Sequence, residues 1–234
     1  MNYESRMKKE EVLARLSDLT DTLTPMELEQ VLNKMQVRQY RKNETIYCEG
    51  DIPSHMLCLV SGKVKIYKEG VGGRAQIVRV ADAVEYFGYR AAFSDENYVT
   101  AAAAFEPSVI ASIPIGLVRQ LIMRNPQLGW FFIQKLAVAL GKSDARTVNL
   151  TQKHIRARLA ESILFLKDSY GTEDDGKTLC IRLSREDMAN LSNMTTSNAI
   201  RHLNAFAQEQ LIDLDGRKIR ILDEATLQKI SRMG

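Results

Sequence analysis

Apolar positions in the first half of the chain change from a helical to a β-strand pattern. The segment Thr24-Pro25-Met26-Glu27 is a helix start, in which Thr24 caps and Glu27 completes a capping box. From about 37 to 114, short β-rich runs are separated by turn residues such as Gly50-Asp51 and Ser61-Gly62. Short strands at regular spacing predict an antiparallel barrel or sandwich. We expect strands over 45–48, 56–60, 64–67, 75–80 and 109–113.

A long helical pattern begins after Asn125-Pro126 and is apolar over more than half of its circumference. Such a helix is expected to be buried on two sides, by its own domain and by something else. Steps of three and four residues define one seam along it, which suits the interface of a homodimer. An ordinary core helix is the alternative on periodicity alone. The expected seam is Ile133, Ala137, Leu140, Asp144, Thr147 and Thr151.

The last third of the chain has the pattern of a separate domain. A helix over 155–166 and a polar loop at 171–176 precede two helices, which begin near Ser184 and Thr195. Two apolar pieces around Asp215-Gly216 predict a hairpin. Helix, tight turn, helix and hairpin is the layout of a winged helix-turn-helix. We therefore expect an α+β fold in three parts. These are 1–125 (helices and barrel), 126–153 (dimerisation helix and hinge) and 154–234 (winged helix-turn-helix).

The second helix of such a motif enters the major groove of DNA and places its first residues on base edges. Here that helix carries short polar side chains, and Arg201 can form two hydrogen bonds to a guanine. Arg185 heads the first helix, while the hairpin cations, Arg220 included, are placed to reach phosphate. A merely solvated polar face would not explain this order of elements. The expected DNA contacts are Arg185, Thr195, Thr196, Ser197, Asn198, Arg201, His202, Asn204, Arg217 and Lys218.

Composition narrows the class of protein only a little. The chain has 234 residues, of which 45% are hydrophobic and 26% charged, and its net charge is +3. These values are those of an ordinary globular protein, so the placement of charge matters more than the sum. Paired carboxylates, a nucleophile elbow, a Walker loop and an HExxH motif are all lacking. We therefore expect a binding protein and not an enzyme.

Cysteine usage and hydropathy indicate the compartment. Cys48, Cys58 and Cys180 are odd in number and lack CxxC spacing, which argues against disulfides or a metal site. We expect buried free thiols in a reducing cytoplasm. The N-terminus has no apolar core of signal-peptide length, and no apolar run approaches the roughly 18 residues of a membrane span. We therefore expect a cytoplasmic protein that has no contact with a membrane.

From about Met26 to its end, the chain resembles the family of the cyclic AMP receptor protein and the fumarate-nitrate reductase regulator (CRP/FNR). The resemblance rests on the order and spacing of several motifs. These are Gly50-Asp51, Leu57–Val64, Phe87-Gly88, Ile113-Pro114 and the helix-turn-helix with its wing. The resemblance implies a jelly-roll barrel like a cyclic-nucleotide-binding domain, a dimerisation helix, and a two-fold dimer on a near-palindromic operator. Many members recruit RNA polymerase.

The chain departs from members that bind cyclic nucleotides. Those members have a Glu for the ribose hydroxyl after the Phe-Gly-like pair, where this chain has Tyr89. Their Arg-Ser or Arg-Thr pair, which holds the cyclic phosphate, is replaced by Tyr98-Val99. A buried phosphate needs a cation or several donors, and Arg90, the nearby cation, lies at the wrong place in the motif. We therefore expect no cyclic AMP binding. The expected effector pocket is Phe87, Gly88, Tyr89, Arg90, Tyr98, Val99, Thr100, Ser143 and Asp144.

The sequence also bears on the cofactors that other branches of the family bind. Iron-sulfur members use N-terminal cysteines, and this chain has none before Cys48, so we expect no cluster. Haem stays open, with Met56 or His154 as candidate ligands, while His55 is expected in a loop. Three further functions stay open beside the main one: a cyclic AMP sensor, a gas sensor, and a ligand sensor whose helix-turn-helix serves protein contact. The effector itself is unknown.

The recognition helix also departs from common members of the family. Those members carry an Arg-Glu pair in the first turn of the helix and a second Arg one turn later. Here Thr196 and Ser197 replace the pair, while Arg201 remains. Because that Glu accepts a hydrogen bond from cytosine, its loss should change the sequence that is read.

Overall fold

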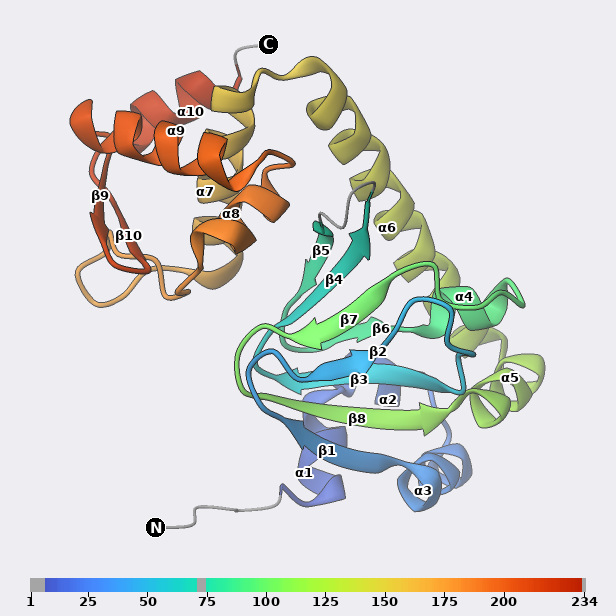
Figure 1. The fold of residues 1–234 in the computed structure, drawn as a ribbon. Helices are drawn as coiled ribbons and strands as arrows, with labels where there is room; N and C mark the ends of the chain where they lie inside the picture. Colours follow the sequence, from blue (N-terminus) through green and yellow to red (C-terminus); the bar gives the residue numbers. More distant parts are fainter. Residues whose placement is uncertain (1–6, 71–74, 233–234) are drawn as a thin grey trace. The chain divides into compact units, whose positions relative to one another are not determined.

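The computed structural model describes residues 7–70 and 75–232, apart from the side chains of Leu150 and Thr151. Contacts divide the chain into two compact units (Figure 1). The first comprises Met1–Lys68 with Val78–Leu140, and the second comprises Glu69–Ile77 with Gly141–Gly234. The limits expected from the sequence, after 125 and after 153, stay a prediction.

The first unit opens with three short helices, α1 (Lys9–Arg15), α2 (Ser17–Thr20) and α3 (Pro25–Lys34). The predicted start of α3 is confirmed, since the backbone amide of Thr24 donates to the Glu27 carboxylate at 2.9 Å and Thr24 Oγ1 accepts from the amide of Glu27. Together these bonds form the capping box and fix where the helix begins.

The strands form two four-stranded sheets, as expected for a jelly-roll (Figure 1). One sheet has the order β1-β8-β3-β6 and the other β2-β7-β4-β5. The strands of the first sheet are β1 (Gln36–Tyr40), β8 (Ser108–Pro114), β3 (His55–Ser61) and β6 (Glu85–Phe87). Those of the second are β2 (Thr45–Tyr47), β7 (Ala101–Ala104), β4 (Val64–Glu69) and β5 (Ala75–Ala81).

All five predicted strands are present, and the described residues of this unit contain three further strands that were not predicted. The residues of β7 are four alanines, which have low β-propensity, and β6 has only three residues. His55 begins β3, so its expected position in a loop is wrong. The short helices α4 (Tyr89–Phe93) and α5 (Ile115–Arg124) complete this part of the unit.

Strand β3 is buried on both faces, and its sequence is therefore a continuous apolar run from Met56 to Val60. Leu57 and Leu59 belong to the core between the sheets. Met56, Cys58 and Val60 alternate with them and belong to a second core, shared with the N-terminal helices, α5 and the start of α6. The barrel thus has an interior core and an outer, helix-covered core.

Helix α6 (Pro126–Gln152) buries one side in its own unit. Leu128, Phe131 and Phe132 belong to the outer core, whereas Ile133 is 55% exposed and Leu140 is 64% exposed. The sequence predicted burial on two sides, and within a single chain one of these sides remains open to solvent.

The second unit contains the helices and hairpin that the sequence predicted. Its elements are α7 (Ile155–Tyr170), α8 (Arg185–Leu191), α9 (Thr196–Gln208), β9 (Ile212–Asp215), β10 (Lys218–Ile221) and α10 (Glu224–Ser231). Side chains of Ser184, Thr195 and Asp223 cap α8, α9 and α10. Asn193 takes a left-handed conformation, with φ at 50°, in the tight turn between α8 and α9.

The expectation of buried thiols holds for one cysteine of three. Cys58 is buried in the outer core, and this burial raises the pKa of its thiol. Cys48 and Cys180 are exposed, so that part of the expectation is wrong. Cys48 directly follows β2 and Cys180 lies in the segment before α8, where the chain turns at the surface.

Candidate nucleic-acid interface and effector domain

Helix α9 presents a polar face because its opposite face is anchored in the core of the unit. Ala199, Leu203 and Phe206 are fully buried. The side chains about half a turn away are exposed, and these are Thr196, Ser197, Ile200, Arg201 and Asn204. Helical spacing in the sequence predicts that Ile200 lies on the inner face together with Ala199, Leu203 and Phe206. This prediction is wrong for Ile200, which is 42% exposed at the edge of the polar face.

Two polar residues on α9 are bonded to each other. Arg201 Nη2 donates to Asn198 Oδ1 at 3.0 Å, across one helical turn. Asn198 is itself placed at the start of the helix, where its amide donates to Thr195 Oγ1 at 3.3 Å. The helix cap and the arginine are thus linked, and Arg201 is exposed.

His202 lies off this face and is half-buried. Burial removes water from its ring and lowers its pKa, and the cations Arg201 and Arg156 lower it further. The ring is therefore neutral at neutral pH and adds no charge to the helix.

Arg185 connects α8 to the wing. Its Nη2 donates to the carbonyl of Gly216 at 3.0 Å, in the turn between β9 and β10. Its Nη1 is buried and has no hydrogen-bond partner among the residues described. Arg185 therefore supports the position of the wing turn in this structure.

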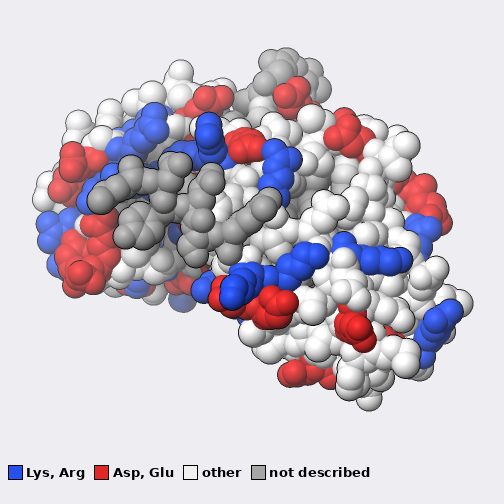
Figure 2. Space-filling view, turned by 90° about the horizontal axis from the view of Figure 1, so that it is seen from below, with Lys and Arg blue, Asp and Glu red and all other residues white. Residues whose placement is uncertain are grey.

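The three basic side chains of the wing differ in their partners. Lys218 Nζ lies 3.1 Å from the Glu173 carboxylate, and Arg220 Nε lies 3.5 Å from that of Asp175. Arg217 is exposed and its side chain has no partner within 7–70 and 75–232. On the visible face of the molecule, basic and acidic groups are interspersed (Figure 2). The expected cations are thus present, but two of them are already paired.

Aromatic side chains fill the barrel interior where an effector was expected. The rings of Tyr47 and Tyr98 stack with centroids 3.8 Å apart and planes 18° apart. Phe87 lies beside them, with its centroid 6.4 Å from that of Tyr47. Desolvation by burial raises the pKa of both tyrosines, so their hydroxyls are neutral at any ordinary pH.

Most of the remaining effector candidates do not converge on this stack. Tyr89 packs against Phe93 and Phe132 in the outer core. Arg90 pairs with Glu96 at 3.6 Å on the surface. Gly88 begins α4, Val99 is exposed, and Thr100 forms a hydrogen bond with Tyr47. Ser143 and Asp144 lie exposed on the part of α6 that belongs to the other unit. Of the expected pocket, the structure thus brings Phe87, Tyr98 and Thr100 to Tyr47, and it brings Gly88 so close to the Tyr98 hydroxyl that a Cβ there would lie 3.0 Å from it.

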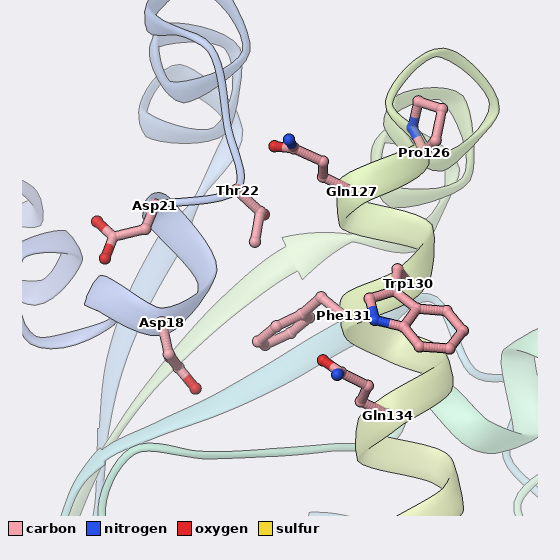
Figure 3. Close-up of a pocket in the computed structure, with 8 residues that line it drawn as sticks. All are labelled: Asp18, Asp21, Thr22, Pro126, Gln127, Trp130, Phe131 and Gln134. Carbon is pink, nitrogen blue, oxygen red and sulfur yellow. The ribbon is translucent and has the colours of Figure 1, made fainter.

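A groove of about 540 Å³ runs between α2 and the start of α6 (Figure 3). Its walls include Asp21, Gln127, Trp130 and Gln134. The side chains do not converge on a common point, since Asp21 and Trp130 point in opposite directions in Figure 3. This groove lacks the convergent polar groups of a small-molecule site.

The expected dimer seam lies on the open side of α6. Ile133, Ala137, Leu140, Asp144 and Thr147 are all exposed, and Trp130 continues the series toward the start of the helix. The side chain of Thr151 lies outside the described residues. An exposed apolar series on a helix whose other side is buried is typical of an oligomer interface.

Neither a metal centre nor a membrane span is found within 7–70 and 75–232. No group of three or more His, Cys, Asp or Glu side chains there could hold a metal ion. No helix in those ranges combines the length and the apolar character needed to cross a membrane.

Comparison with known sequences agrees with this two-part organisation. Residues 37–125 match the family described as cyclic nucleotide-binding domain, and residues 157–230 match the Crp-like helix-turn-helix domain. The CRP-like cAMP-activated global transcriptional regulator of Mycobacterium tuberculosis is 22% identical, over 95% of this chain and all of that protein. The global nitrogen regulator of Synechococcus elongatus is 24% identical, over 83% of this chain and 89% of that protein.

Solved structures show the same fold. FixK2 from Bradyrhizobium japonicum superposes with a TM-score of 0.75 at 20% identity, over 86% of this chain and 98% of that one. A CRP-family transcriptional regulator from Thermus thermophilus has a TM-score of 0.73 at 23% identity, over 83% of this chain and 96% of that one.

The fold and the exposed face of α9 define a DNA-binding transcription regulator with a winged helix-turn-helix. The chain belongs to the CRP/FNR family.

Proposed function

We propose that the protein acts as a homodimer that binds a near-palindromic operator in the cytoplasm and regulates transcription by contact with RNA polymerase. It acts through binding and not through catalysis. The observation that carries the proposal is the exposed face of α9, with Arg201 bonded to Asn198 and the opposite face fully buried. A helix presented in this way has the geometry of a recognition helix in the major groove.

On this proposal, α9 reads bases with a mixture of polar and apolar contacts. Arg201 bonds a guanine, and Thr196, Ser197 and Asn198 read or position its neighbours, with Thr195, His202 and Asn204 nearby. Ile200, which the helical pattern placed in the core, adds an apolar contact suited to a thymine methyl group. Its exposed position could have been found from its angle on the helix, which lies outside the arc of the buried residues.

The dimer forms through the open side of α6. Ile133, Ala137 and Leu140 follow at steps of four and three residues and are exposed in the single chain. Pairing two copies along this seam covers apolar surface that water otherwise contacts. It also relates the two α9 helices of the dimer by one two-fold axis.

The effector domain does not bind cyclic AMP on this proposal. Support comes from the stacked Tyr47 and Tyr98, which fill the barrel interior, and from Arg90, which pairs with Glu96 outside it. The two cations near Tyr47 are already engaged, Arg79 with the Tyr86 carbonyl and Arg90 with the Glu96 carboxylate. A cyclic phosphate there would meet two neutral phenols and no free cation among the described residues. Isothermal calorimetry with cyclic AMP should give no heat of binding at concentrations up to about 1 mM. Micromolar binding would overturn this part of the proposal.

Haem binding through Met56 is likewise not part of the proposed function. Met56 is buried in the outer core, and the cavity that it lines measures about 10 Å³. A porphyrin needs hundreds of Å³, as do ligand sites in general. His154 precedes α7 in the second unit, so it lies in a different unit from Met56.

A gel-shift series with genomic fragments tests the proposal against a role of the helix-turn-helix in protein contact. Specific retention of some fragments, lost on substitution of Arg201→Ala, supports DNA reading. Equal retention of all fragments by both proteins contradicts it.

A further inference from the structure

The segment that directly follows the acidic loop 171–176 is attached to the wing by backbone hydrogen bonds. The amide of Ile221 donates to the carbonyl of Lys177, and the amide of Leu179 donates to that of Ile219, both at 2.9 Å. An antiparallel bridge between Thr178 and Arg220 continues this pairing. The chain that leaves the loop therefore runs beside β10, and it holds the carboxylates of the loop next to the wing.

Hydrogen bonds from the neighbouring residues hold the Asp175 carboxylate in place. Its carboxylate accepts hydrogen bonds from the amides of Lys177 and Thr178, at 2.9 and 2.8 Å, and from Thr178 Oγ1 at 2.7 Å. Its Oδ2 also lies 3.5 Å from Arg220 Nε. The loop is thus a structured arrangement of acids and not a free tail.

Glu173 makes the closer ion pair of the two. Its carboxylate lies 3.1 Å from Lys218 Nζ, and both side chains are about one-third exposed. Lys218, which the sequence predicts to contact DNA phosphate, therefore already has a carboxylate partner. Arg217, in the hairpin turn, has no such partner among the described residues.

We propose that Glu173 sets the DNA affinity of the wing by holding Lys218 in an internal ion pair, so that Arg217 is the wing's main phosphate contact. The argument is electrostatic and rests on the DNA-binding function. A protein gains affinity for DNA when its cations displace counterions from phosphates. A lysine paired with a carboxylate carries no net charge as a pair, so it displaces none unless the pair first opens.

The test compares two variants that change the net charge equally. Glu173→Gln removes the partner of Lys218, whereas Asp174→Asn removes a neighbouring exposed acid that has no partner within 75–232. DNA affinity is measured against salt concentration, on a preferred site and on an unrelated duplex. Circular dichroism and thermal melting confirm that each variant folds.

Glu173→Gln should bind both duplexes more tightly, with a logarithmic salt slope steeper by about 0.9, the value for one added phosphate contact. If the two proteins bind equally at 1 M salt, this slope gives about an eightfold gain at 0.1 M. Asp174→Asn should keep the wild-type slope. Equal slopes for the two variants, or no change in either, would overturn the proposal.

Removing the lysine provides an independent check. In the Glu173→Gln background, where no carboxylate is left unpaired, Lys218→Ala should abolish the gain. A gain that persists in this double variant would show that it does not come from Lys218, and would refute the inference. Failure of the wild-type protein to bind any duplex would instead refute the proposed DNA-reading function, so the two outcomes are distinguishable.

Discussion

Placing a charge at Leu140 should dissociate the proposed dimer. Leu140 is 64% exposed in the single chain and lies in the middle of the seam on α6. Burying a leucine side chain fully contributes about 1.5–3 kcal/mol. About two-thirds of this is available at an interface, which gives roughly 1–2 kcal/mol per chain and 2–4 kcal/mol per dimer.

Leu140→Glu removes this apolar contribution and places two carboxylates opposite each other across the seam. The loss of apolar contact alone raises the dissociation constant of the dimer by about 30- to 700-fold, since 1.4 kcal/mol is tenfold. Charge repulsion in the partly buried seam adds to that figure. Sedimentation velocity over a range of protein concentrations measures the change directly.

Val138→Glu provides the matched control. Val138 is 60% exposed on the same helix, and it lies about 160° around the helix axis from Leu140. This variant should remain a dimer. If Leu140→Glu sediments as a dimer, or if Val138→Glu dissociates instead, then the seam has been assigned to the wrong side of α6.

Three further outcomes follow from the second unit. Ile200→Ala should weaken binding by about 1 kcal/mol at sites that have a thymine beside the arginine contact and leave other sites unchanged, as measured by fluorescence anisotropy. Arg185→Ala, which removes the bond to the Gly216 carbonyl, should lower the free energy of unfolding by roughly 1–2 kcal/mol in urea titrations. The amides of Thr178 and Lys177 lower the pKa of Asp175 to about 2, so its contribution to stability is complete above the ordinary value of 3.8 and is lost as pH falls toward 2. Asp175→Asn should therefore flatten the dependence of unfolding on pH in that range, and an unchanged profile would count against the hydrogen bonds.

The parts of the fold that sequence predicted are those that depend on local chemistry. Ser184, Thr195 and Asp223 cap their helices through side chains only three residues from the amides that they bind, so the starts of α8, α9 and α10 were predictable. The alternation of residues predicted the strands that have β-branched side chains. It could not predict β7, whose alanines are in a strand because β2 and β4 pair with them on both sides.

The parts of the site that were not predicted depend on residues far apart in the chain. Tyr98 stacks on Tyr47 because the barrel brings β2 and the segment before β7 together, and no local pattern encodes that contact. Lys218 and Glu173 are 45 positions apart, so a count of wing cations could not show that one was paired. The spacing of apolar residues placed Ile200 on the inner face with Leu203 and Phe206, although it lies about 100° around the helix axis from the buried Ala199.

The most direct test of the central claim, that α9 reads DNA through Arg201, is selection of binding sites from random duplexes. The wild-type protein should enrich a near-palindrome with half-sites about one helical turn apart and a guanine in each half. Arg201→Ala should lose preference at that one base pair and bind the wild-type site about 1–3 kcal/mol more weakly. Arg217→Ala should bind more weakly while enriching the same motif, because a phosphate contact carries no base preference. A non-palindromic motif, or an Arg201→Ala protein that enriches the wild-type motif unchanged, would contradict the account.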